Sequence, residues 1–358
     1  LTTNWKCPCS RPSRRKGQLK KGVRTLAEKK TKEMYSKEQL LEFYRTMVRI
    51  RTFEEKAAEC FTKGMLAGNI HLSIGQEAAE AGAFAAIGPQ DYFTSTHRGH
   101  AIARGADPKL AMAELFGKKT GYCKGKGGSM HIADMEKMNH LGANGIVGGG
   151  QPISAGSALA SKILGDGAVT VGCFGDGATN EGSFHESLNM AAAWKLPMVW
   201  FIENNCYGVS TEIHRVTNTS HLASRAEAYG VPYAIVDGTN PTEVYEAMQK
   251  AMEHARSGKG PYLVEATVYR YQGHYCGDPA VYRPKEYMEH ALENDGIMKL
   301  GKRLLALGAT QEELDEITAA ADAEMTEAVK FADESEYPDP ATVLDDMYVS
   351  DNERCVAR

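Results

Sequence analysis

The sequence predicts an α/β fold in which a doubly wound, mostly parallel sheet carries helices on both faces. Residues 168–174 form a short apolar run rich in β-branched side chains, as expected of a strand that is buried on both faces. Residues 182–194 place apolar side chains at the spacing of one helix face, and a second apolar run follows at 197–202. Strand, helix and strand in this order indicate one βαβ unit with parallel strands.

Further elements on either side of this unit follow from similar patterns. Ser36 and Gln39 form the capping-box pattern at the start of a long predicted helix. We expect the acidic helix over 310–332 to face a partner or solvent, and the loop over 272–284 to be a mobile part of a site. Between these ends the sequence predicts a helix over 220–229, a strand over 233–236, a helix over 241–256 and a strand over 262–271.

Length and composition limit the class of protein. Among the 358 residues, 42% are hydrophobic, which is enough for a large core, and the net charge of −5 gives no reason to expect nucleic acid binding. The longest apolar runs fall far short of a membrane span. We expect a basic, disordered arm over 1–35, a single α/β domain over 36–348 and a tail over 349–358.

The cysteines and the basic arm bear on location. The eight cysteines are scattered without CxxC spacing, which favours reduced thiols in the cytoplasm and no cysteine-bound metal. Residues 1–27 hold eight Lys or Arg and no acid, so a transit peptide and a mitochondrial matrix location remain the alternative.

Two polar clusters follow the two strands of the βαβ unit and point to a metal-bound diphosphate. Asp176 lies between Gly175 and Gly177, and Asn205 ends the second run. The carboxyl ends of parallel strands meet at one edge, so these clusters should lie together. Mg²⁺ takes about six oxygen ligands, and a carboxylate, an amide oxygen and the Tyr207 carbonyl would suit it. Either cluster alone is also ordinary turn chemistry, but together they favour the site.

These motifs resemble those of a known family. The Gly-Asp-Gly triplet with the later Asn pair resembles the thiamine diphosphate motif, and residues 175–211 resemble the α subunit of the first component of 2-oxo acid dehydrogenase complexes. Further blocks at 94–100, 125–131, 142–147 and 269–274 are similar to that family, whose bacterial pyruvate and acetoin dehydrogenases come nearest. The resemblance runs from about residue 36 to 348 and implies the thiamine diphosphate-binding fold.

The resemblance assigns cofactor roles residue by residue. Asp176, Asn205 and the Tyr207 carbonyl match the Mg²⁺ ligands, while Arg98 and His274 match neighbours of the diphosphate. A guanidinium suits phosphate because its planar donors bind two oxygens at once. Other implied cofactor neighbours are His97, Gly145, Val147, Gly175, Gly177 and Ala178.

Two histidines are catalytic candidates. His274 would handle protons near the thiazolium ring, and His71 would lie at the substrate entrance. For His71 and His97 a structural role is an equal alternative. Gly145 and Val147 match positions that offer backbone groups to the aminopyrimidine ring, although a flexible glycine loop would also explain them.

The resemblance also implies partners and a reaction. The sequence shows no second copy of the sheet pattern, so the carboxylate that activates thiamine is expected on a β subunit, in an α₂β₂ heteromer inactive without it. The implied reaction is oxidative decarboxylation of pyruvate or cleavage of acetoin, with acetyl transfer to the lipoyl group of an acyltransferase partner. A branched-chain 2-oxo acid dehydrogenase, a transketolase-like half enzyme and a partner without activity remain alternatives.

Overall fold

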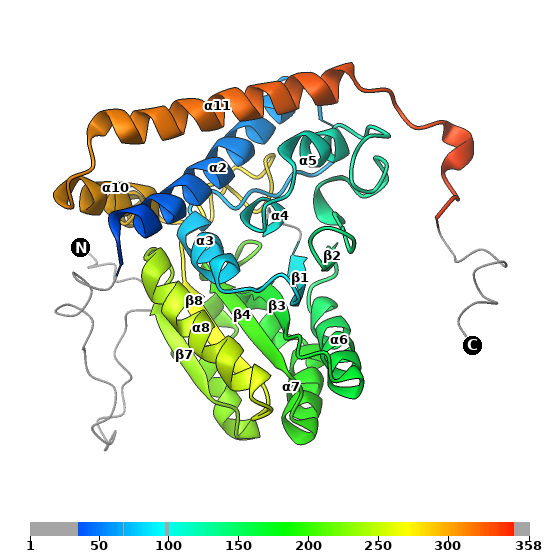
Figure 1. Ribbon diagram of the computed structural model, residues 1–358, viewed down its shortest axis with the longest axis vertical. Coiled ribbons are helices and arrows are strands. Elements are labelled where there is room, and N and C mark those ends of the chain that lie inside the picture. The colour runs from blue at the N-terminus through cyan, green and yellow to red at the C-terminus, as the bar shows by residue number, and fades with distance from the viewer. Residues whose placement is uncertain (1–34, 67, 97–99, 347–358) are drawn as a thin grey trace.

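The described part of the chain is built around a six-stranded sheet with helices on both faces (Figure 1). The computed structural model describes residues 35–66, 68–96 and 100–346. Strand order is β2-β1-β3-β4-β8-β7, and every neighbouring pair in this sheet is parallel, which confirms the predicted fold class. The strands are β1 (Tyr92–Thr96), β2 (His140–Asn144), β3 (Thr170–Gly175), β4 (Met198–Asn204), β7 (Tyr233–Asp237) and β8 (Tyr262–Thr267). A small separate hairpin pairs β5 (Tyr207–Gly208) with β6 (Thr211–Glu212).

Helices connect and cover these strands. The α-helices are α2 (Lys37–Thr62), α3 (Glu77–Ala85), α4 (His100–Ala103), α5 (Pro108–Leu115), α6 (Gly150–Leu164), α7 (Gly182–Trp194), α8 (Pro241–Arg256), α9 (Lys285–Glu293), α10 (Gly296–Ala306) and α11 (Gln311–Glu334). Short 3₁₀ turns occupy Gly128–Met130, Asp176–Asn180, Ile213–Arg215, Ala223–Tyr229 and Pro340–Thr342.

The central strand β4 shows why the sheet is covered on both sides. Its side chains alternate between two hydrophobic clusters, and all seven residues are buried. Val199 and Phe201 pack in the cluster that includes α2, α3 and α8, whereas Trp200 packs in the cluster that includes α6 and α7. A strand buried on both faces favours apolar side chains, which is the pattern that the sequence carries at 197–202. The last two residues of β4, Glu203 and Asn204, are polar and are paired with His100 and Glu265.

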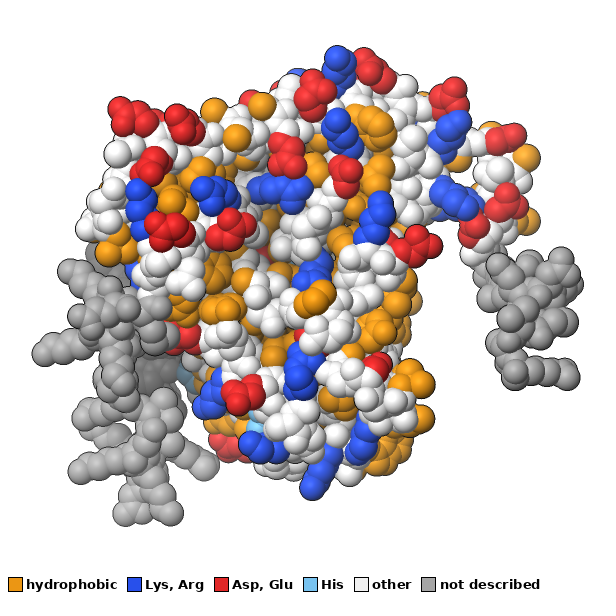
Figure 2. Space-filling model, in the orientation of Figure 1, with side chains coloured by type: hydrophobic (Ala, Val, Ile, Leu, Met, Phe, Trp, Pro, Cys, Tyr) orange, Lys and Arg blue, Asp and Glu red, His pale blue; other side chains and the backbone are white. Residues whose placement is uncertain are grey.

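Helices α2, α10 and α11 form a layer beyond the sheet. The predicted capping box is present, because the Ser36 hydroxyl accepts from the Gln39 amide and the Gln39 side chain accepts from the Ser36 amide. The expectation that residues 310–332 face partner or solvent is wrong for one face of α11. Leu314, Ala321 and Met325 are buried there against α2 and α5 at helical spacing, while charged side chains cover its outer face (Figure 2).

Other expectations differ in detail from the structure. Helices α7 and α8 begin and end as predicted. Strand β8 ends at Thr267 rather than at 271, because its neighbours β4 and β7 end beside it and offer no further pairing. The helix expected over 220–229 is a 3₁₀ turn over Ala223–Tyr229.

Some predictions concern residues outside this description. The arm up to residue 34 and the tail from 349 lie outside the described residues. The five described cysteines are free thiols. None of the described helices combines the length and the apolar character needed to cross a bilayer.

Candidate functional site

A cavity of about 270 Å³ lies at the carboxyl ends of the four strands β1 to β4. Thr96 ends β1, Asn144 ends β2 and Gly175 ends β3, and all three line the cavity. Strands β1 and β3 are neighbours in the sheet. From β1 the chain continues to β2 on one side, and from β3 it continues to β4 on the opposite side. This is the topological switch point at which open α/β sheets bind ligands.

Asp176 and Asn205, predicted together, do line this one cavity. Asp176 opens the 3₁₀ turn after β3 and is 2% exposed; its carbonyl accepts a hydrogen bond from the Thr179 hydroxyl at 2.7 Å. Asn205 follows β4 and is 4% exposed. Its Nδ2 donates to Gln76 Oε1 at 2.9 Å, and its Oδ1 accepts from the Tyr207 amide at 3.2 Å.

The Tyr207 carbonyl is held by a cation that the sequence patterns did not single out. Arg270 is 1% exposed, and its Nη1 donates to this carbonyl at 3.4 Å while its Nη2 donates to the Val209 carbonyl at 3.0 Å. Arg270 and Tyr207 both line the cavity. The sequence signal for Arg270 was its place in the 269–274 block, four residues before His274.

The turn that joins Asn205 to Tyr207 is strained. Cys206 has a φ of 68°, in the left-handed region, which costs a non-glycine residue roughly 1–2 kcal/mol. Two hydrogen bonds hold the turn, since Asn204 Oδ1 accepts from the Cys206 amide at 3.1 Å and the Tyr287 hydroxyl donates to the Asn205 carbonyl at 3.3 Å. Strain that persists under such support is common where side chains must be aimed at a ligand.

The glycines around Asp176 are not required by the protein's own packing. Gly175 and Gly177 both lie outside the positive-φ region, and a Cβ on Gly177 would meet only the Gly208 Cα, at 3.5 Å. Both residues line the cavity, as does Ala178, which is 4% exposed. Close approach of a ligand to this backbone would explain the absence of side chains.

The two catalytic candidates lie against each other. His274 lines the cavity, and its ring meets the ring of His71 edge to face with centroids 4.9 Å apart. His71 is buried behind His274 and is not part of the cavity lining. The Asp278 carboxylate fixes the backbone here by accepting from the His274 amide and the Tyr282 hydroxyl, both at 2.7 Å. Burial opposes ionisation of Asp278, but these hydrogen bonds lower its pKa below the usual value.

The structure divides the remaining predicted residues. Val147 lines the cavity and is 52% exposed, so it lies on the rim. Gly145 lies between the lining residues Asn144 and Ile146 without being one of them. His97 and Arg98 lie outside the described residues.

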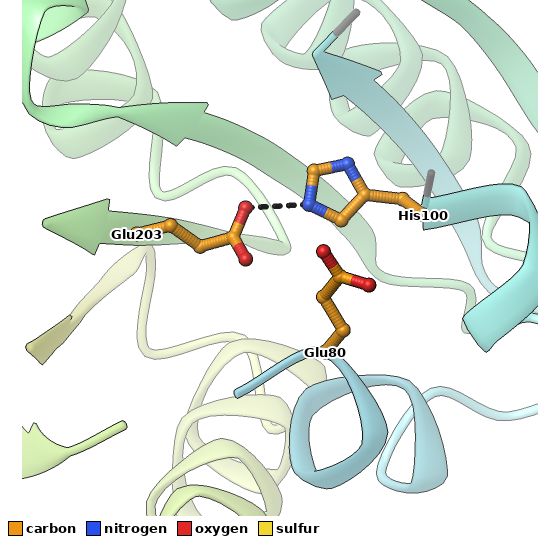
Figure 3. Close-up of side chains that lie close together, drawn as sticks. All are labelled: Glu80, His100 and Glu203. Carbon is orange, nitrogen blue, oxygen red and sulfur yellow. Dashed lines mark hydrogen bonds and ion pairs between the residues drawn. The ribbon is translucent and has the colours of Figure 1, made fainter. Parts of the chain in front are cut away.

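A buried polar cluster lies behind the cavity, where Glu80 of α3, His100 of α4 and Glu203 of β4 point toward one another (Figure 3). Each is at most 3% exposed, and His100 Nε2 lies 2.5 Å from Glu203 Oε2. Burial, with the nearby charge of Glu203, raises the pKa of Glu80 well above its usual value. The sequence patterns did not predict this cluster. The one signal was Glu80, a carboxylate within the alanine-rich stretch of α3.

The chain is similar to known proteins over most of its length. Residues 45–341 match the family described as the dehydrogenase E1 component, within the predicted domain of 36–348. The α subunit of acetoin:2,6-dichlorophenolindophenol oxidoreductase from Bacillus subtilis is 46% identical over 88% of this chain and 95% of its own. The corresponding subunit from Cupriavidus necator is 43% identical over the same shares.

Pyruvate dehydrogenases are also among its relatives. The α subunit of the pyruvate dehydrogenase E1 component from Zymomonas mobilis is 42% identical over 84% of this chain and 86% of its own. Identity at this level over nearly whole chains, together with the family match, confirms the resemblance inferred from the motifs. The chain belongs to the dehydrogenase E1 component family.

Proposed function

We propose that this chain is the α subunit of a thiamine diphosphate- and Mg²⁺-dependent dehydrogenase that acts on pyruvate or acetoin. The observation that carries the proposal is the joint presence of Asp176, Asn205 and Tyr207 at one cavity on the switch point of the sheet. Family membership supports thiamine diphosphate, and the names of the relatives support the two substrates. The acetyl group would pass to the lipoyl group of an acyltransferase partner, as proposed from the sequence.

The donor set suits a hard divalent cation. The Asp176 carboxylate would supply charge, and Asn205 Oδ1 and the Tyr207 carbonyl would supply neutral oxygens, in keeping with the ligands that Mg²⁺ prefers. The bare backbone of Gly175 and Gly177 and the first turn of α6, where Gly150 lines the cavity, would accept the diphosphate, since amides at a helix start favour negative charge. Arg98 and His97 would also neighbour the diphosphate end of the cofactor. Ala178 would form part of the cavity wall beside the cofactor.

The histidine pair would handle protons. When bound, thiamine diphosphate supplies a nucleophilic carbon and an electron sink for cleaving the bond beside a carbonyl. His274, at the cavity wall, would give or take a proton at a ring nitrogen, and His71 would orient its ring through their edge-to-face contact. Gly145 and Val147 would offer backbone groups to the pyrimidine end, at the open rim.

Exposed apolar side chains support a partner subunit at this rim. Ile146 and Val147 are 75% and 52% exposed beside the cavity. Apolar side chains also lie along the edge formed by α6 and α7 (Figure 2), where Ile163, Leu164 and Trp194 are exposed. A cavity of about 270 Å³ is at or below the small end of the roughly 300–1,000 Å³ usual for ligand sites, which fits a chain that holds part of a shared cofactor. We propose a β subunit there, in an α₂β₂ heteromer of the cytoplasm.

Coexpression with the adjacent β subunit tests this function. The purified heteromer should oxidise pyruvate or acetoin with an artificial electron acceptor, and activity should require both thiamine diphosphate and Mg²⁺. Branched 2-oxo acids serve as comparison substrates in the same assay. The α chain alone should be inactive, so full activity without the β subunit would refute the two-subunit proposal.

A further inference from the structure

A continuous set of side-chain hydrogen bonds runs from the proposed metal ligand Asn205 into the protein interior. Asn205 Nδ2 donates to Gln76 Oε1 at 2.9 Å, and Gln76 Nε2 donates to Glu203 Oε1 at 3.4 Å. Gln76 is 1% exposed, just before the first residue of α3, and it lines the cavity together with Asn205 and Glu203. The three side chains come from two segments that are far apart in sequence.

The direction of these hydrogen bonds is fixed at one end. A carboxylate oxygen accepts hydrogen bonds, and Glu203 Oε1 accepts from the amino group of the Gln76 amide. The Gln76 oxygen then faces Asn205, which must present its own amino group in return. Asn205 is thereby turned so that Oδ1, the atom that a cation needs, points away from Gln76 and toward the Tyr207 amide at 3.2 Å.

Glu203 is itself held in place from the other side. Its Oε2 lies 2.5 Å from His100 Nε2, and Glu80 faces the pair (Figure 3). The side chains are enclosed, with Glu80 and His100 0% and Glu203 2% exposed. A residue in such a setting has few alternative rotamers, so its carboxylate is a fixed reference for the amide next to it.

We infer that Gln76 is a positioning residue that turns the amide of Asn205 so that its oxygen faces the metal, and that the Glu203 carboxylate sets this direction. The inference rests on the proposed function, because it requires Asn205 to be a metal ligand. Partners of this kind, one bond removed from the ligand, commonly change metal affinity about 10- to 100-fold when they are replaced.

The test is a calorimetric titration of Mg²⁺ into the α–β heteromer, with thiamine diphosphate in excess. Gln76→Leu should weaken Mg²⁺ binding about 10-fold. Glu203→Gln should weaken Mg²⁺ binding less. The oxygen of the new amide can still accept a hydrogen bond from Gln76, but an amide, which can also donate, no longer fixes the orientation of Gln76. The double variant Gln76→Glu with Glu203→Gln moves the carboxylate one step closer to Asn205 and preserves the orientation, so it should restore affinity close to wild type.

Melting temperatures of the metal-free heteromers separate positioning from structural support. A merely structural role would lower stability in the double variant too and would give no recovery of Mg²⁺ affinity. Gln249→Leu on the exposed side of α8 is the matched control and should bind Mg²⁺ as wild type does.

Each outcome decides between the two claims. Wild-type affinity in Gln76→Leu, or no recovery in the double variant, would overturn the inference while leaving the proposed function intact. If the wild-type heteromer itself binds no Mg²⁺ in the presence of thiamine diphosphate, the proposed function fails and the inference fails with it. Should Gln76→Leu not fold, Glu203→Gln and the double variant still give the comparison.

Discussion

The cavity edge and the sealed cluster behind it contain similar side chains in opposite situations. At the edge, Asp176 is 2% exposed and Asn205 is 4% exposed, and both border open space. In the sealed cluster, Glu80, His100 and Glu203 are equally buried but face one another. Burial alone therefore does not distinguish a ligand from its support. A position at the cavity wall separates Asp176 and Asn205 from Glu80 and His100, whereas Glu203 lines the cavity and also contacts His100. Strain of the kind found at Cys206 further marks the side of the proposed ligands.

The largest effect is expected at the edge. Asp176→Ala removes the one carboxylate among the proposed metal ligands, and loss of several kcal/mol of charge stabilisation corresponds to a fall in kcat/KM on the order of 10³-fold. Steady-state kinetics of the heteromer at saturating thiamine diphosphate and Mg²⁺ measure it. Asp315→Ala on the exposed face of α11 is the control, and equal kinetics of the two variants would contradict the assignment of Asp176.

The second effect concerns the buried residue His140, near the cluster of Glu80, His100 and Glu203. His140 lies 2.9 Å from the Ser95 hydroxyl, and burial, with a smaller contribution from His100, lowers its pKa to about 3. Below pH 6.5 the unfolded chain binds a proton that the folded chain does not, so stability should fall with decreasing pH down to about 3. This contribution has a slope of about 1.4 kcal/mol per pH unit.

Denaturant unfolding between pH 6.5 and 4.5 isolates this contribution. His140→Gln keeps a hydrogen-bonding group toward Ser95 but cannot titrate, so its stability should vary less with pH than that of the wild type. The difference should reach about 2 kcal/mol across this interval, because the slope is only half its full value at pH 6.5. Parallel pH profiles for the two proteins would show that His140 is not neutral when folded.

A third effect separates glycines of the edge from glycines of the core. Gly177→Ala leaves the fold intact, because its Cβ would meet only the Gly208 Cα at 3.5 Å. It should weaken thiamine diphosphate binding roughly 10- to 100-fold by shifting the diphosphate. Gly82→Ala should do the reverse, since its Cβ would lie 2.5 Å from the Pro241 carbonyl, and so lower stability with little change in affinity.

Fluorescence titration with thiamine diphosphate and thermal unfolding of both variants make the comparison. A large loss of melting temperature in Gly177→Ala would assign that glycine to packing rather than to the cofactor.

The smallest effect is expected at Glu80. Its carboxyl group makes no hydrogen bond of ordinary length within the described part of the chain, although the Ser73 hydroxyl lies near it. Replacing a buried polar group of this kind by methionine of similar size should raise stability by about 1 kcal/mol. Glu80→Gln keeps a polar group and should not gain as much. Urea unfolding of both variants at neutral pH measures the difference, and a clear loss in Glu80→Met would show that the carboxyl group has a stabilising partner.

The sequence predicted one half of the sheet well. Apolar runs and a helical spacing located β3, α7 and β4, because buried parallel strands and an amphipathic helix leave strong patterns. These elements alone predict that Asp176 and Asn205 lie together at the carboxyl edge of the sheet. The β8 strand was extended to 271 because apolar and aromatic residues continue there after its partners end.

The other half left no such pattern. Strand β2 has the sequence HLGAN, without a β-branched residue, and α6 begins with a glycine and a proline within a glycine-rich stretch. These elements form because their neighbours provide pairing and packing, so tertiary context overrides local propensity. The Glu80, His100 and Glu203 cluster was out of reach for the same reason, since its members come from three separate elements.

The contact between the starts of α2 and α11 has a consequence for biosynthesis. Lys37 Nζ lies 2.8 Å from Glu313 Oε1 although 276 residues separate them. At roughly 5–20 residues per second, a ribosome needs about 15 to 55 s to make the chain between these two points. During that time the apolar face of α2, with Leu40 and Met47, lacks the α10 and α11 side chains that later cover it. The nascent chain therefore exposes the apolar face of α2 until α10 and α11 have been synthesised and can cover it.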